Sequence, residues 1–402
     1  MESATQFSPQ RTFHIGKYVL AYDILLQGLR GCRAPTQWLS IPELLARYPE
    51  SATLQTVAPA RVLPEFKYTY HGSEALYQLG VMPEQHLPPT HVLTIPHGRT
   101  FGRFGVVHVP AADCSLAEYD EGTVSLAILR NDLPGGRLNP RYWKHAAKWH
   151  WQRRMLPQAM SCPGKVAVLN CSSSHNFFHW LIEILPRLWT LQQSGAQPDW
   201  YVIDAYLPFQ RKTLQALGVP LEKVIQPHVS LHVEADELLV PSLFFPNACR
   251  EVGAQLAQQL NVVDDPRAPR RIFINRRKSR RTKNAAALAV LLRKFGFEEH
   301  FLEDYPLAKQ IALFRQAEVV LAPHGAGLTH LIHCRPGTEV IELMPAGRMQ
   351  LCYPTLSRIG GLRHTVMSVP KSFLGHALDV PLAELETVLA TATNRRALPA
   401  AA

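Results

Sequence analysis

The chain has 402 residues, a length that suits two α/β domains better than one hydrophobic core. Apolar residues make up 47% and charged residues 18%, so large buried cores are expected and wholesale disorder is excluded. The formal net charge of +10 favours an anionic partner, and composition alone does not choose between a phosphate-bearing substrate, nucleic acid and an acidic membrane face.

Targeting and membrane-spanning signals are not evident in the sequence. The one apolar stretch near the start, residues 18–26, lacks a cationic start and is interrupted by Asp23, so no signal peptide is expected. Seven cysteines are scattered without a CxxC pair, which argues against a zinc site and against a disulfide framework. We therefore expect a soluble cytoplasmic protein without a bound metal, and peripheral contact with the inner face of an anionic membrane stays open.

The first half of the chain changes character at Lys165. Residues 1–90 are hard to interpret beyond a short helix at 43–48 and a Pro-rich connector at 59–65. After Lys165, strands alternate with helices, which is typical of a parallel sheet with right-handed crossovers. Strands are expected at 106–109, 123–129, 166–170, 200–204, 223–225 and 237–240, and helices at 142–154, 175–193 and 209–217.

A second alternation of strands and helices follows the Asp- and Pro-rich segment 264–269, the best linker candidate. Strands are expected at 271–275, 299–302, 318–322, 338–343 and 362–369, and helices at 284–295, 307–316, 325–334, 350–359 and 382–393. The prediction is an α/β protein with two doubly wound domains. The expected boundaries are 1–90 and 91–263 for the first domain, 264–375 for the second, and 376–402 for a terminal helix and tail.

The sharpest motif is the Gly-Ala-Gly turn between the strand at 318–322 and the helix that follows it. Glycines let a phosphate approach the backbone, and the first N–H groups of a helix supply partial positive charge. An ordinary tight turn is the alternative. A dinucleotide-binding fingerprint is disfavoured, since His330 replaces the third glycine of GxGxxG. The expected anion-binding residues are His324, Gly325, Ala326, Gly327, Leu328 and Thr329.

Residues 270–283 hold eight basic side chains, most of them after the carboxyl end of a strand. Arginine forks match phosphate oxygens, so Arg276 and Arg277, directly after the strand, are the preferred phosphate ligands. A solvated charge run or a nucleic-acid patch is the alternative, although interleaved aromatic residues are absent here. Glu342, at the end of the next strand after the Gly-Ala-Gly motif, is either a ligand of ribose hydroxyls or a solvated acid.

A third cluster places His175, His179, Glu183 and Arg187 four residues apart, near one face of a helix. Two histidines with a carboxylate one turn away suit a general base and the group that holds its tautomer. A structural network is the second interpretation, and a zinc site is the third because HExxH order is missing. Asp204, at a strand end, is the reserve candidate for the base.

Together these clusters resemble glycosyltransferase family 61, which includes bacterial capsular-polysaccharide enzymes, plant xylan xylosyltransferases and an animal O-GlcNAc transferase. The likeness covers roughly residues 165–345 and is strongest in the segment from Pro323 to His330. It implies a GT-B fold with an interdomain cleft, an inverting mechanism and no required metal or other cofactor. On this basis His179, oriented by Glu183, is the expected base, and the glycine and arginine motifs bind a nucleoside-diphosphate sugar, with a UDP-sugar preferred.

The expected partners are the nucleotide-sugar donor and a glycan or lipid-linked acceptor in surface polysaccharide biosynthesis, such as capsule, without nucleic acid. Two alternatives stay open at this point. One is a non-enzymatic basic protein that binds nucleic acid or an anionic surface, and the other is a different sugar-nucleotide enzyme such as an epimerase, because a fold does not fix a function.

Overall fold

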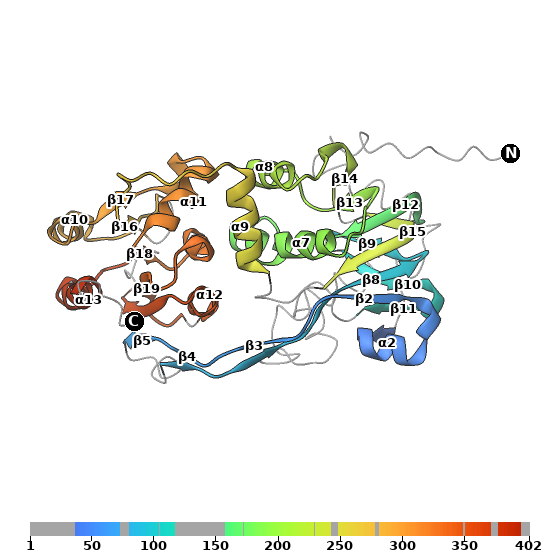
Figure 1. Ribbon diagram of the computed structural model, residues 1–402, viewed down its shortest axis with the longest axis horizontal. Helices are drawn as coiled ribbons and strands as arrows, with labels where there is room; N and C mark the ends of the chain where they lie inside the picture. Colours follow the sequence, from blue (N-terminus) through green and yellow to red (C-terminus); the bar gives the residue numbers. More distant parts are fainter. Residues whose placement is uncertain are drawn as a thin grey trace. The chain divides into compact units, whose positions relative to one another are not determined.

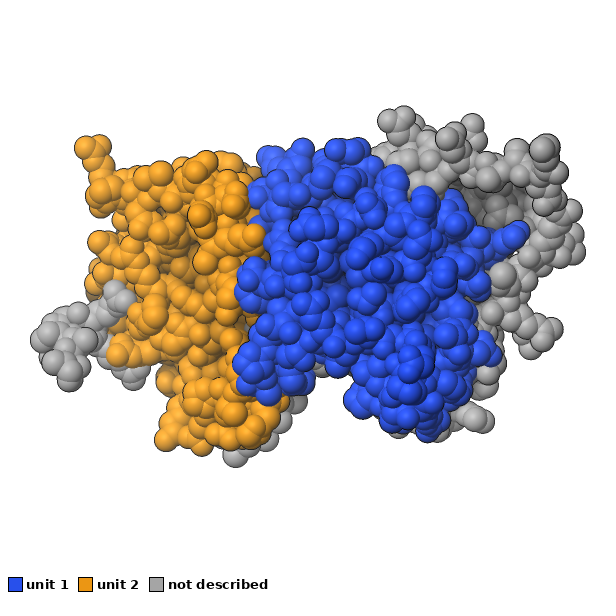
Figure 2. All heavy atoms as spheres, turned by 45° about the vertical axis from the view of Figure 1, so that its right-hand side comes forward, with its two compact units in different colours: residues 1–60, 88–247 blue, residues 61–87, 248–402 orange. Residues whose placement is uncertain are grey.

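The computed structural model describes residues 37–72, 80–103, 105–116, 157–171, 173–228, 230–242, 248–277, 281–348, 350–370 and 377–394. The chain divides into two compact units, coloured separately in Figure 2. The first unit comprises residues 1–60 and 88–247, and the second comprises residues 61–87 and 248–402. The expected strands and helices at 123–129 and 142–154 lie outside the described residues.

The first unit contains one mixed sheet (Figure 1). Its strands are β1 (Gln37–Leu39), β2 (Thr53–Ala58), β8 (Thr90–Pro96), β9 (Arg99–Phe101), β10 (Val106–Val109), β11 (Cys114–Leu116), β12 (Met160–Val168), β13 (Trp200–Val202), β14 (Val224–Ile225) and β15 (His232–Pro241). Strands β15, β12, β13 and β14 are parallel neighbours in that order, while β8 and β9 pair antiparallel with β15. After β12 the chain first adds β13 and β14 on one side of β12 and later adds β15 on its other side. The boundary between β12 and β15 is therefore a topological switch point.

The helices of this unit are explained by local signals. Helix α2 (Ile41–Arg47) begins with a capping box between Ser40 and Glu43, and α8 (Pro208–Ala216) begins with a proline in its first turn. The expected helix at 175–193 consists of α6 (Phe177–His179), a π-helical turn (Trp180–Ile184) and α7 (Leu185–Gln193). The wider turn lies directly before Pro186, which has no N–H for the regular helical bond.

The second unit contains a six-stranded sheet in which every neighbouring pair is parallel. Its strands are β5 (Thr69–His71), β16 (Arg271–Ile274), β17 (Glu298–His300), β18 (Val319–Pro323), β19 (Glu339–Pro345) and β20 (Arg363–Val369). The order β17-β16-β18-β19-β20-β5 reproduces the expected five-strand doubly wound pattern, with the switch point between β16 and β18. The sixth strand, β5, comes from the N-terminal part of the chain and was not expected.

Helices cover this sheet (Figure 1). They are α9 (Cys249–Gln259), α10 (Ala285–Lys294), α11 (Leu307–Gln316), the 3₁₀ helix η9 (Ala326–His333), α12 (Cys352–Gly360) and α13 (Leu382–Asn394). Leu288 and Leu292 of α10 share a buried core with Leu385 and Leu389 of α13 and with strand residues such as Leu321. Helix α13 is thus part of the second unit rather than a separate tail.

The mixed α/β architecture with parallel sheets is confirmed, and several details differ from expectation. The second unit starts at residue 248, because α9 packs with it, so the segment 264–269 is a loop inside that unit. The segment 59–65, expected as a connector, contains strand β3 (Arg61–Leu63), which pairs with β7 (Gln85–Leu87). The helix expected at 325–334 is 3₁₀ rather than α.

Candidate functional site

The switch point of the second unit brings two of the sequence motifs together. Arg276 and Arg277 follow the carboxyl end of β16, and His324 follows the carboxyl end of the adjacent strand β18. Nη1 of Arg276 donates a hydrogen bond to the backbone carbonyl of His324 at 3.4 Å. Ligands of open α/β sheets bind outside the carboxyl ends of the strands at such a point, so the arrangement forms a candidate phosphate cradle.

Close packing in the cradle depends on a glycine. A β-carbon added at Gly327 would lie 3.1 Å from Cδ1 of Leu302 and 3.3 Å from Cγ2 of Ile274, the last residue of β16. These contacts are tighter than ordinary van der Waals distances, so a side chain at this position would displace its neighbours. The missing side chain therefore lets the start of η9 approach the end of β16, where a phosphate would meet backbone N–H groups.

Arg277 is held in a defined position. It forms an ion pair with Asp304, and its guanidinium lies 4.2 Å from the centre of the Phe301 ring. About half of its side chain, 51%, is exposed. Stacking of a planar guanidinium on an aromatic ring orients its donors in advance, which suits it to bind a phosphate from solvent.

The expected contacts from Leu328 and Thr329 are limited to their backbone. Both side chains are fully buried, and Oγ1 of Thr329 donates to the carbonyl of Ala326 at 2.6 Å. The N–H of Leu328 donates to the carbonyl of Gly325 at 2.9 Å, which closes the first turn of η9. Only Ala326 and Gly327 of this stretch are partly exposed, so the exposed part of the cradle is narrower than the sequence suggested.

Glu342 occupies a different environment from the one expected of a ribose ligand. Its carboxylate is fully buried and accepts hydrogen bonds on both oxygens, from Nδ1 of His324 at Oε1 and from Nε2 of His364 at Oε2, the latter at 3.0 Å. Oγ of Ser357 lies 2.7 Å from the other nitrogen of His364. A carboxylate without exposed surface orients these histidines, so we assign Glu342 a positioning role in place of direct ribose contact.

The hydrogen bonds fix the position of His324. Its Nδ1 meets the Glu342 carboxylate, and its Nε2 lies 2.6 Å from Oε1 of Gln350. Burial raises the pKa of Glu342, but its hydrogen bonds and Coulombic interactions with His324 and His364 outweigh burial and lower it overall. The cradle therefore contains a buried histidine–carboxylate pair that holds the His324 ring in one orientation.

Sequence reasoning missed His364, Ser357 and Gln350. His364 lies in β20, two residues before the cross-strand partner of Glu342, and so shares a sheet face with it. Strand β20 has the mixed sequence RHTVMSV, so its histidine gave no distinct signal. His330 has a structural position, because it is fully buried, its Nε2 lies 2.8 Å from Oε1 of Gln310, and burial lowers its pKa to about 3.

The third cluster, in the first unit, is only partly assembled. Nδ1 of His179 lies 2.9 Å from Oε1 of Glu183, and the two side chains are 33% and 23% exposed. The thiol of Cys171 donates to the other oxygen of Glu183 at 3.8 Å, and burial followed by the Glu183 charge raises the pKa of Cys171 to about 12. His179 is thus an accessible imidazole, and one of its two nitrogens is held by a fixed carboxylate. This is the geometry of a general base and the group that orients it.

Arg187, the last member of the expected polar stripe, points elsewhere. Its side chain is buried and donates to the carbonyls of Val168 at 2.8 Å, Leu169 at 3.0 Å and Asn170 at 2.8 Å. These carbonyls lie at the carboxyl end of β12, beside β15. The guanidinium therefore fills the switch point of the first unit and satisfies its backbone, which is a structural role.

Asp204, the reserve base, is enclosed. Only 1% of the residue is exposed, and its carboxylate accepts hydrogen bonds from Oγ of Ser174 and from Nε2 of Gln226, the latter at 2.7 Å. Burial is the largest influence and raises the pKa of Asp204, against the lowering effect of Ser174, Arg103 and Gln226. A buried acid with both oxygens bonded is a weaker base candidate than His179.

Comparison with known proteins agrees with these motifs. Residues 177–341 match the family described as Glycosyltransferase 61, so the resemblance inferred from the motifs is confirmed. Two rice (Oryza sativa subsp. japonica) proteins are similar over short stretches: Beta-1,2-xylosyltransferase XYXT1 is 32% identical over 88 residues and Beta-1,2-xylosyltransferase RCN11 is 30% identical over 83 residues. The matched stretches cover 22% and 21% of this chain, but only 19% and 15% of the two relatives.

Proposed function

We propose that this protein is a glycosyltransferase that moves a sugar from a nucleoside-diphosphate sugar, preferably a UDP-sugar, to a hydroxyl of a glycan or lipid-linked acceptor. The observation that carries the proposal is the meeting of Arg276 with the His324–Gly327 turn at the switch point of a parallel sheet. The family match over residues 177–341 supports it, because that segment contains both this turn and the His179–Glu183 pair. The substrates and activity of the two rice relatives support only the general class, since the matched part of each is short.

In this proposal the second unit binds the donor. Its fixed positive groups are the guanidinium groups of Arg276 and Arg277 and the partial positive charges on the first amides of η9. Such preorganised charge stabilises a departing diphosphate without reorganisation during the reaction. This supports a mechanism in which protein groups replace a divalent cation, and that independence from metal is part of the proposal.

The first unit receives the acceptor in the GT-B arrangement that the family resemblance implies. His179 removes the proton of the attacking hydroxyl, and Glu183 stabilises the imidazolium that forms and fixes its tautomer. The hydroxyl oxygen then forms the new bond to the anomeric carbon while the diphosphate leaves from the opposite face, so the configuration inverts. The location that we propose is cytoplasmic, in the synthesis of a surface polysaccharide such as capsule.

Within the described residues, no helix is both long enough and apolar enough to cross a bilayer. Cys114, Cys162, Cys171, Cys249, Cys334 and Cys352 are all free thiols.

A thermal-shift screen over nucleoside diphosphates and their sugars is the first test. We expect one nucleoside diphosphate to raise the melting temperature, and product analysis to show its release from the sugar donor only in the presence of an acceptor, apart from slow hydrolysis. An epimerase would convert the donor without releasing the nucleotide. A basic binding protein would show affinity that falls steeply with salt and ignores the sugar nucleotide, and either result would reject the proposal.

A further inference from the structure

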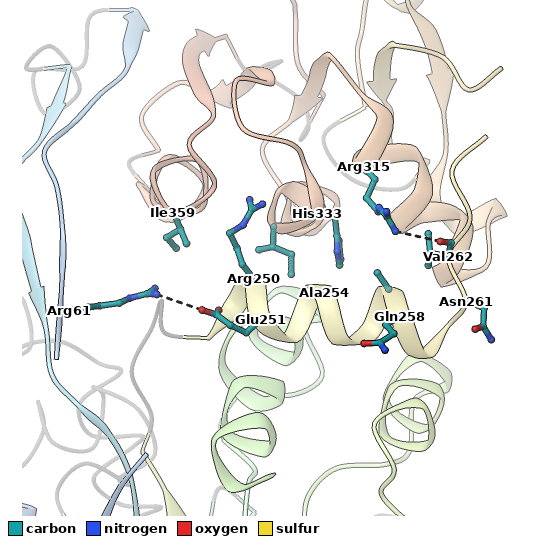
Figure 3. Close-up of a pocket in the computed structure, with 13 residues that line it drawn as sticks. Arg61, Arg250, Glu251, Ala254, Gln258, Asn261, Val262, Arg315, His333 and Ile359 are labelled. Atoms are coloured by element: carbon teal, nitrogen blue, oxygen red, sulfur yellow. Dashed lines mark hydrogen bonds and ion pairs between the residues drawn. The ribbon is translucent and has the colours of Figure 1, made fainter. Parts of the chain in front are cut away.

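A cavity lies within the second unit and is formed by elements other than those of the phosphate cradle. Its volume is about 790 Å³, and Figure 3 shows its side chains gathered around α9. The lining comes from β3, α9, the loop after α9, and the C-terminal ends of α11, η9 and α12. Neither Arg276 nor Arg277 lines it, and neither does any residue of the 324–329 turn.

Positive charge dominates the cavity wall. Its charged side chains are Arg61, Arg250 and Arg315 against the single carboxylate of Glu251. Nη1 of Arg61 and Oε1 of Glu251 are 3.8 Å apart, and both side chains are partly exposed, so this ion pair is weak. Figure 3 shows Arg61 and Arg250 approaching the cavity from different elements, the first from β3 and the second from α9.

The other two arginines have unequal partners. Nε of Arg315 lies 3.4 Å from the Asp264 carboxylate, which compensates its charge. Nη1 of Arg250 donates to the backbone carbonyl of Cys334 at 3.2 Å, a neutral partner that leaves the charge of Arg250 uncompensated. The excess charge of the cavity is therefore concentrated at Arg250, with Arg61 next to it in strength.

Several nitrogen atoms of the wall lack a hydrogen-bond partner among the described residues. They are Nε and Nη2 of Arg61 and Nε2 of His333. His333 is 8% exposed, and burial lowers its pKa well below the usual range, with His330, Arg250 and Arg315 adding to the effect. Buried nitrogens of this kind are normally satisfied, so those of Arg61 show that the weak ion pair with Glu251 leaves its guanidinium incompletely paired.

The floor of the cavity is apolar and closely packed. It is formed by Ala254 and Ala257 of α9 together with Ile332 and Ile359. A β-carbon added at Gly253 would lie 3.1 Å from Cδ1 of Ile332, so α9 packs directly on η9 at this point. A rigid apolar floor beside cationic walls suits a ligand with an anionic group and a carbon part.

We propose that this cavity binds an organic phosphate, with its oxygens on Arg61 and Arg250 and its carbon part on the floor formed by α9 and η9. The ligand replaces the carboxylate of Glu251 as the partner of Arg61. The site goes beyond the proposed transferase activity, because none of its residues belongs to the donor cradle or to the His179–Glu183 pair. The same phosphate chemistry is offered by a soluble phosphate ester and by an anionic lipid headgroup.

The test uses glycerol 3-phosphate as the soluble probe and measures affinity by calorimetry on the full chain. Glu251→Gln removes the competing carboxylate and raises affinity about three-fold, whereas Arg61→Ala lowers it by about the same factor. Glu65→Gln, at an exposed ion pair with Lys67 in the same unit, is the matched control and leaves affinity unchanged. Equal affinity in all four proteins would overturn the proposal, and the gain in Glu251→Gln cannot arise from misfolding.

Hydrogen exchange locates the probe, and vesicles identify its source. Binding of glycerol 3-phosphate protects peptides that cover residues 249–262 and 331–334, and protection confined to residues 323–330 would overturn the site. Phosphatidylglycerol vesicles, with phosphatidylcholine vesicles as the control, provide the lipid arm. Stronger binding by Glu251→Gln in either arm supports the site. The arm in which it occurs shows whether the phosphate belongs to a soluble ester or to a lipid headgroup. If the protein binds the probe at this cavity but binds no nucleoside diphosphate, the site proposed here is supported and the proposed transferase function is rejected.

Discussion

The protein contains two histidine–glutamate pairs that share their chemistry and differ in their surroundings. His179 and Glu183 lie on adjacent turns of one helical segment, and their side chains are 33% and 23% exposed. His324 and Glu342 come from neighbouring parallel strands and are 4% and 0% exposed. In the first pair the imidazole is accessible to solvent and to a substrate hydroxyl. In the second, burial and the contact with Gln350 hold both ring nitrogens in place.

This difference shows how one residue combination serves two purposes. An accessible imidazole with one nitrogen held by a carboxylate has its other nitrogen available as a base. A buried imidazole whose two nitrogens both have partners is fixed in orientation and has no nitrogen available as a base. The assignment of roles therefore depends on exposure and on the partner of the second nitrogen, and substitutions that exchange or remove these partners test it directly.

Removal of the accessible imidazole should have the largest effect on catalysis. His179→Ala is expected to lower turnover by about 10²–10⁴-fold with donor affinity nearly intact, because a general base acts in the transition state and not in donor binding. Turnover is measured by release of nucleoside diphosphate, and donor affinity by calorimetry. His86→Ala, an exposed histidine paired with Glu84 at 3.1 Å, is the control. Unchanged turnover in His179→Ala would remove it as the base.

Loss of the buried carboxylate should affect stability more than any other single change in the cradle. Glu342→Gln removes the buried carboxylate that accepts hydrogen bonds from His324 and His364, at an expected cost of about 3 kcal/mol in the free energy of unfolding. The measurement is denaturant unfolding, and Glu339→Gln, whose carboxylate pairs with the partly exposed Arg363 at 3.0 Å, serves as the comparison. Equal destabilisation by the two substitutions would contradict a special role for the buried pair.

The same carboxylate predicts a pH dependence. The pKa of Glu342 is lowered in the folded protein, so its contribution to stability is present above the unfolded value of about 4.3 and is lost as the pH falls through the folded pKa. Wild-type protein should therefore lose stability more steeply than Glu342→Gln as the pH falls below about 4. Parallel stability curves for the two proteins in acid would show that Glu342 is not ionised in the fold.

Removal of the exposed donor of the cradle should weaken binding moderately. Arg277→Ala is expected to reduce affinity for the nucleoside diphosphate about ten-fold, because one charge-assisted hydrogen bond to phosphate is lost. Arg270→Ala is a matched control, since Arg270 precedes the amino end of the same strand, β16, and pairs with Glu318 at 3.6 Å. Calorimetry at fixed salt measures both. Equal losses would mean that overall charge, and not the carboxyl end of β16, governs binding.

The sequence predicted the position of the cradle better than its internal contacts. Strand order and turn chemistry are local signals, so the meeting of Arg276 with the Gly-Ala-Gly turn followed from two strand ends in one parallel sheet. The burial of Glu342 was not predicted from the sequence. Its partner His364 lies on the neighbouring strand, and hydrophobic periodicity does not show which residues of two strands lie beside each other. Strand β5 also escaped prediction, since a three-residue strand joins β20 from a distant part of the chain.

The smallest expected effect concerns Gln350, whose Oε1 lies 2.6 Å from Nε2 of His324 and which is itself exposed. A phosphate oxygen in the cradle would compete with the Gln350 amide oxygen for the same N–H, and a charged acceptor forms the stronger bond. Gln350→Ala should therefore raise affinity for the nucleoside diphosphate two- to three-fold, or about 0.5 kcal/mol, by removing the competitor. Calorimetry of Gln350→Ala in the Glu342→Gln background should show no such gain, because the carboxylate that holds the His324 ring in place is missing there. A loss of affinity in the single variant would instead make Gln350 a direct ligand of the donor.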